Sequence, residues 1–132
     1  MKCCECPKCV SVYLTMYPFV PRSALTKIFG ADLFLRVETI PILRELAGLE
    51  IKPFECVATR AEIVAALAAA IDKVHAAGEA LPPVLDYALR SIPGIRDSVR
   101  GSTILSSYGP HRIPQELEKV LTKALNKSPR SL

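Results

Sequence analysis

The sequence contains no tryptophan, and only 6% of its residues are aromatic. We therefore expect a core built from Leu, Ile, Val and Ala. No apolar run approaches the roughly 20 residues that a membrane helix needs, and Lys2, Pro7 and Lys8 interrupt the N-terminal apolar residues, so we expect no signal peptide. There is one asparagine and one glutamine. Such a scarcity of thermolabile amides is typical of proteins from hot environments.

The usual signatures of an active site are also absent. The chain has no glycine-rich phosphate loop and no metal-binding carboxylate motif. Its two histidines, His75 and His111, have no paired nucleophile or carboxylate motif. His75 falls near the end of an expected helix, where a cation suits the helix dipole, and His111 falls in an expected turn. The sequence therefore predicts that the protein is not an enzyme.

The length of 132 residues suits one modest hydrophobic core. The net charge is +4, of which residues 1–66 carry +1 (8 basic, 7 acidic) and residues 67–132 carry +3 (9 basic, 6 acidic). This balance permits contact with nucleic acid without demanding it. The 11 prolines divide the chain into short elements.

The pattern of apolar residues, prolines and glycines predicts an all-α fold of short, broken helices. One segment differs, because residues 10–17 alternate between apolar and polar side chains, which is typical of a strand or an extended arm. Pro41 should kink or split the second helix. The expected helices cover residues 23–29, 32–47, 59–77, 82–92 and 114–127, with a short helix around residues 96–100.

The helix expected after Thr59 has the clearest start signal. Thr59 and Glu62 form a capping box, in which each side chain bonds a free backbone N–H of the first turn. No charged residue occurs from Ile63 to Ile71, and a helix that is apolar all round is buried on more than one side. We expect the second buried side to be a subunit interface. The small residues that would form it are Ala65, Ala66, Ala69 and Ala70.

The five cysteines allow three interpretations. Cys6-Pro-Lys-Cys9 resembles half of a zinc knuckle, although the chain has no second half at standard spacing. A disulfide is the alternative, from the N-terminal cluster to Cys56, and it would stabilise a particle outside the cell. Free thiols are the third interpretation. The candidates for either bond are Cys3, Cys4, Cys6, Cys9 and Cys56.

Basic side chains among apolar residues are candidates for phosphate contacts, because arginine binds phosphate through two parallel hydrogen bonds. The alternative is an ordinary solvated helix face. The residues that we expect to contact DNA phosphate are Arg22, Lys27, Arg36, Arg44, Lys52, Arg96 and Arg100.

Short motifs after Ala88 resemble those of a known family. They are Ala88-Leu-Arg-Ser-Ile, Val99-Arg-Gly, Ser107-Tyr-Gly, Pro114-Gln-Glu-Leu and Ser128-Pro. In this order they are similar to the C-terminal part of the major capsid proteins of rod-shaped and filamentous viruses of hyperthermophilic archaea. The resemblance implies an all-α protein that pairs with a second copy or a related capsid protein and polymerises on double-stranded DNA, held in the A form.

The resemblance also implies that two parts of the chain have different roles. Residues 1–58 would form an N-terminal arm with the cysteine cluster and DNA-wrapping helices, and residues 59–132 a C-terminal helical bundle. The protein would reside in the virion, and in the host cytoplasm during assembly. We expect no cofactor unless the cysteines bind zinc. The alternatives are a small zinc-stabilised nucleic-acid-binding or regulatory protein, and a helical protein–protein adaptor.

Overall fold

The computed structural model describes residues 4–51, 57–96 and 112–127. The predicted all-α class is confirmed, since these residues form helices and turns and contain no strand. The α-helices are α1 (Pro7–Met16), α2 (Arg22–Phe29), α3 (Ile40–Leu46), α4 (Arg60–Ala76), α5 (Pro83–Ser91) and α7 (Gln115–Lys127), and η1 (Val37–Thr39) is a short 3-10 helix.

The strand or extended arm expected at residues 10–17 is wrong, because this segment is helix α1. Cys6 caps the helix with its side chain, and Pro7 occupies the first turn, where its missing N–H is not needed. The buried side chains of Val10, Tyr13 and Leu14 follow helical spacing. The alternation of apolar and polar residues thus suggested a strand, although the buried side chains lie on one face of a helix.

The helix expected over residues 32–47, kinked or split by Pro41, is wrong at its start. The Asp32 side chain accepts a hydrogen bond from the Phe34 backbone N–H at 3.0 Å, so residues 32–36 form a turn instead of a helix start. Helix α3 begins only at Ile40, with Pro41 in its first turn. The proline therefore opens a shorter helix and does not kink a longer one.

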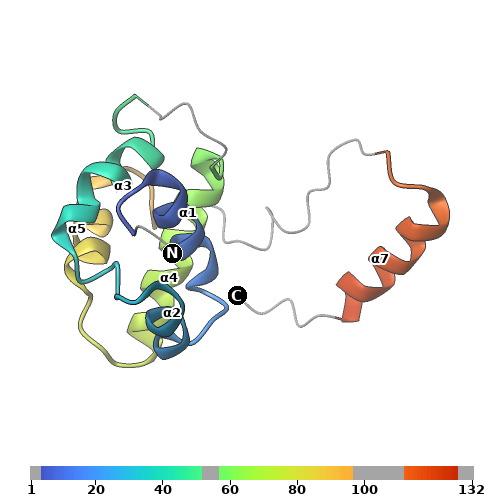
Figure 1. Ribbon diagram of the computed structural model, residues 1–132, viewed down its shortest axis with the longest axis horizontal. Coiled ribbons are helices and arrows are strands. Elements are labelled where there is room, and N and C mark those ends of the chain that lie inside the picture. Colours follow the sequence, from blue (N-terminus) through green and yellow to red (C-terminus); the bar gives the residue numbers. More distant parts are fainter. Residues whose placement is uncertain (1–3, 52–56, 97–111, 128–132) are drawn as a thin grey trace.

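Helix α4 is the longest helix and the centre of the fold (Figure 1). Its predicted capping box is confirmed: the Thr59 hydroxyl accepts from the Glu62 N–H, and the Glu62 carboxylate accepts from the Thr59 N–H at 2.6 Å. Helix α4 packs on α1 and on α5, and α1 also contacts α2 and α3. Helices from both ends of the segment 4–96 are thereby joined through α4.

The core is less aliphatic than the composition suggested. Tyr13 packs edge-to-face against Phe29 and Phe34, with ring centroids 5.1 and 5.2 Å apart. Tyr17 packs on Phe34 at 4.5 Å. All four side chains are buried. These four aromatic residues meet where α1 and α2 contact the turn at residues 32–36.

The division of the chain after residue 58 stays a prediction. Residues on both sides of it belong to one hydrophobic cluster, which includes Leu14 and Leu43 from the first part and Leu67 and Leu85 from the second.

Helix α7 lies apart from α1–α5 (Figure 1). It is amphipathic, and its large apolar side chains are exposed. Within the described ranges, no helix combines the length and the apolar character needed to cross a membrane. The exposed apolar residues on α7 and just before it are Ile113, Leu117, Val120 and Leu121.

We predict that Leu67→Ala destabilises the fold by about 2–5 kcal/mol, because it leaves a cavity around a side chain that is 0% exposed. Leu117→Ala is the matched control, since Leu117 is 59% exposed and its truncation should cost less than about 0.5 kcal/mol. Urea unfolding followed by circular dichroism measures both. Equal losses in the two variants would contradict the described core.

Candidate functional site

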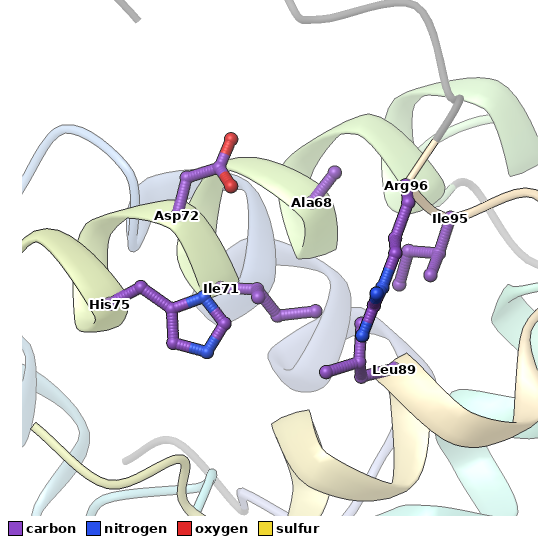
Figure 2. Close-up of a pocket in the computed structure, with 7 residues that line it drawn as sticks. All are labelled: Ala68, Ile71, Asp72, His75, Leu89, Ile95 and Arg96. Atoms are coloured by element: carbon purple, nitrogen blue, oxygen red, sulfur yellow. The ribbon is translucent and has the colours of Figure 1, made fainter.

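A pocket of about 360 Å³ lies between α4 and α5 (Figure 2). Ala68, Ile71, Asp72 and His75 recur at intervals of three and four residues, so they line one face of α4. The opposite wall comes from α5 and from the turn that follows it. The residues of that wall are Leu89, Ile95 and Arg96.

The turn after α5 brings Arg96 back over α4. Helix α5 ends at Ser91, and Gly94 adopts a left-handed conformation with φ 70°, which suits glycine. The Ile95 N–H donates to the Ile92 carbonyl at 3.4 Å, and the Ile95 side chain is buried. Arg96 therefore follows directly after a fixed, buried residue.

Two polar side chains face this pocket from opposite sides. Figure 2 shows the imidazole of His75 and the guanidinium of Arg96 pointing into the hollow, with Ile71 and Leu89 between them. The Asp72 carboxylate stands on the α4 side and points away from the centre. A cationic group and an imidazole above an apolar wall can bind an anionic group that carries carbon atoms.

Sequence reasoning selected Arg96 but missed Asp72 and His75. His75 was interpreted as structural, because no partner is close to it along the chain. The available signal was its spacing from Asp72, which puts both on the side of α4 opposite the stripe of Ile63, Leu67 and Val74.

The other arginines expected at DNA phosphates are engaged within the chain. Arg22 pairs with Asp32 and, at 3.4 Å, with Glu79. Arg36 pairs with Glu5 at 3.4 Å.

Arg44 donates to Glu50 at 2.6 Å and to the Tyr87 hydroxyl at 2.7 Å, which ties α3 to α5. These carboxylates and this hydroxyl engage some of the guanidinium donors of the three arginines. Lys27 is exposed at the end of α2. Lys52 and Arg100 lie outside the described residues.

Asp32 is the centre of the most buried polar cluster. Its carboxylate accepts from the Tyr13 hydroxyl at 2.9 Å, from the Phe34 N–H and from Arg22. Burial, together with the hydrogen bond to Asp32, raises the pKa of Tyr13 well above its ordinary value. The arginine expected to bind DNA therefore joins α2 to α1 and to the following turn.

Lys73 has a similar structural role. Its ammonium group donates to the backbone carbonyls of Tyr17 and Val20 at 2.7 and 2.8 Å. Burial lowers the pKa of this lysine. These two hydrogen bonds fix the segment that follows α1 to helix α4.

The alanines expected at a subunit interface divide into two pairs. Ala65 and Ala70 are buried within the chain, and Ala66 and Ala69 are half-buried. Contact of this face with a second subunit stays a prediction.

The cysteine hypotheses also stay predictions. Cys4 is buried and donates to the Phe29 carbonyl at 3.0 Å, and Cys6 and Cys9 are half-buried at the start of α1. No group of three or more His, Cys, Asp and Glu side chains within residues 4–51, 57–96 and 112–127 is arranged to hold a metal ion. Cys3, Cys56 and His111 lie outside these ranges.

Comparison with known proteins identifies the class of protein. A family model described as the MurL C-terminal domain matches residues 1–97, which include α1–α5 and every residue of the pocket. The match defines a helical domain from a family of enzymes. The chain belongs to the MurL C-terminal domain family.

Three curated relatives bear the name UDP-N-acetyl-α-D-muramoyl-L-alanyl-L-glutamate epimerase. The protein from Micromonospora sp. is 37% identical over 92% of this chain and 27% of its own length. The protein from Salinispora tropica is 47% identical over 49% of this chain and 14% of its own length. The one from Xanthomonas oryzae pv. oryzae is 31% identical over 87% of this chain and 26% of its own length. No solved structure matches the chain.

This chain therefore spans about a quarter of the length of the first of these relatives. The relatives are bacterial and are named as enzymes, so several expectations from the sequence are wrong. The protein is not a viral capsid protein or a zinc-stabilised regulator, and the prediction that it is not an enzyme is contradicted by relatives that are named as epimerases. The expectations that depended on the capsid interpretation are wrong as well. They are double-stranded DNA, a capsid dimer partner, a helical polymer and a virion location.

We predict that Tyr13→Phe makes the fold less sensitive to alkali. The raised pKa of Tyr13 keeps its proton bound in the folded state, whereas an unfolded tyrosine loses its proton near pH 10. Stability is thus lost as the pH rises above about 10, by up to about 1.4 kcal/mol per pH unit for one proton. Tyr17 and Lys73 titrate in both proteins, so the difference isolates Tyr13. Urea unfolding between pH 9 and 11.5 should give a steeper loss for the wild type, and identical slopes would contradict the effect.

Proposed function

We propose that this chain acts as the C-terminal module of an enzyme that epimerises the glutamate residue of UDP-N-acetylmuramoyl-L-alanyl-L-glutamate. The observation that carries the proposal is the identity of 37% over 92% of the chain to a protein of that name. The family match over the whole α1–α5 unit supports the same module.

The chemistry of such a reaction defines what the complete enzyme must do. Inversion at a Cα atom removes the Cα proton and returns a proton to the opposite face, with no net oxidation. The substrate must therefore be held while both faces of one carbon meet proton donors or acceptors. A module of this size contributes part of such a site, since the named relatives are more than three times longer than the segment they share with it.

The proposed enzyme also needs the part that corresponds to the remaining three quarters of these relatives. We place part of the contact with it on the exposed apolar face of α7. Leu117, Val120 and Leu121 share one side of this helix, and Lys119 and Lys123 lie on the other side. Exposed apolar faces of this kind mark protein contacts, and the part of the relatives that this chain does not match is the proposed occupant.

We predict that the chain restores activity to an incomplete relative. The Micromonospora enzyme, lacking the segment that aligns with this chain, is joined to residues 1–132 and given the L-glutamate precursor. Chiral analysis after hydrolysis should detect D-glutamate, and in D₂O the product should carry deuterium at Cα. The truncated enzyme alone and the intact enzyme are the controls. A well-folded chimera without either signal, beside an active intact enzyme, would overturn the proposed function.

We predict that Leu117→Glu weakens association with the truncated Micromonospora enzyme. A buried leucine contributes about 1.5–3 kcal/mol, so affinity should fall by roughly 10- to 100-fold. Thr122→Glu is the matched control, because this exposed residue lies on the opposite side of α7. Biolayer interferometry with the separate chains measures both. Equal effects of the two substitutions would contradict a contact through the apolar face.

A further inference from the structure

Arg96 differs from the paired arginines of the chain. Arg22, Arg36, Arg44 and Arg90 each form an ion pair with a carboxylate of the same chain. Arg60, Arg96 and Arg112 form no ion pair with a carboxylate in the part of the chain that the structure describes. Of these three, Arg96 lines the pocket, and its exposed guanidinium points into the hollow (Figure 2). A guanidinium directed into a hollow offers a planar pair of donors to a ligand carboxylate or phosphate.

The pocket offers one guanidinium to an anionic ligand. Asp72 places a negative charge on the α4 side, and Arg96 supplies the permanent positive charge. The glutamate end of the precursor carries two carboxylates, so one of them pairs with Arg96 and the other must lie away from Asp72. One carboxylate matches the two parallel donors of Arg96.

The remaining surfaces suit short carbon chains. Ala68, Ile71, Leu89 and Ile95 provide the apolar wall between His75 and Arg96. The volume of about 360 Å³ is near the lower end of the range of roughly 300–1,000 Å³ for ligand pockets. It provides room for a dipeptide with a methyl group and two methylenes, but not for a complete nucleotide sugar.

We propose that this pocket binds the L-alanyl-L-glutamate end of the precursor, with one glutamate carboxylate on Arg96 and the carbon atoms against Ile71 and Leu89. This assignment rests on the proposed function for the identity of the substrate. His75 faces the same ligand from α4 and donates or accepts a hydrogen bond at its other end. The nucleotide end then extends out of the pocket toward the rest of the enzyme.

The first test uses the 132-residue chain alone and two probes, the free dipeptide L-Ala-L-Glu and UDP. Two-dimensional NMR follows the backbone amides of residues 68–75 and 89–96 and the imidazole protons of His75. The dipeptide should shift these resonances in a saturable manner. No shift with the dipeptide, or stronger shifts with UDP at the same positions, would overturn the proposal.

Matched arginine substitutions test the contact itself. Arg96→Gln should weaken dipeptide binding by roughly 10- to 100-fold, as expected for the loss of a charge-assisted pair of hydrogen bonds. Arg96→Lys should recover part of the affinity, because the charge returns without the planar fork. Arg90→Gln is the control, since Arg90 is exposed on α5 and pairs with Asp86 outside the pocket. Equal affinity of the Arg96→Gln and Arg90→Gln proteins would overturn the assignment.

The active chimera separates this inference from the proposed function. There, Arg96→Gln should raise KM for the precursor more than it lowers kcat, because the lost contact holds the substrate. An active chimera whose KM is unchanged by Arg96→Gln would overturn the pocket assignment and leave the function standing. An inactive chimera would count against the function, while the NMR titration of the chain alone would still decide whether the pocket binds the dipeptide.

Discussion

The packing of α1 across α4 is the constraint on which the rest of the structure depends. On α1, Tyr13 also packs its ring against Phe29 and Phe34 and places its hydroxyl on Asp32. Asp32 in turn holds Arg22, so one buried carboxylate connects α1, α2 and the following turn. A buried carboxylate is tolerated because both of its oxygens accept hydrogen bonds. With one side of α4 committed to α1, its other side is left to form the pocket with α5.

The sequence predicts a helix boundary of this fold best where the residues that set the boundary lie next to it in the chain. The capping box at Thr59, the left-handed Gly30 after α2 and Pro114 before α7 act within one helical turn, and these boundaries are confirmed. Helix α1 was missed because the alternation of its side chains gives the period of a strand, while Cys6 and Pro7 were interpreted as metal chemistry. Its helical face becomes visible only in the fold, where α1 packs on α2, α3 and α4 and the side chains of Tyr13 and Leu14 are buried.

The functional interpretation failed for a different physical reason. The charges and the apolar pattern of a sequence show which residues are able to bind an anion. They do not show whether a carboxylate of the same chain already pairs with such a residue. Arg22, Arg36 and Arg44 meet carboxylates 10, 31 and 6 residues away in sequence. The short motifs that resembled a capsid family begin at Ala88, whereas the family match covers residues 1–97. Helix and turn signals after Ala88 are shared by unrelated proteins, because they report backbone geometry and not a ligand.

The candidate site could be predicted only in part. Arg96 was selected because arginine binds anions well, and the family match removes the DNA phosphate to which it was assigned. Asp72 and His75 become significant only through the contact of α4 with α5, which no spacing along the chain reveals. The left-handed turn at Gly94 then decides where the arginine lies, since it folds the chain back so that Ile95 is buried and Arg96 faces α4. The same backbone that ends α5 thus places the cation opposite the imidazole, and the pocket follows from how two helices terminate and pack.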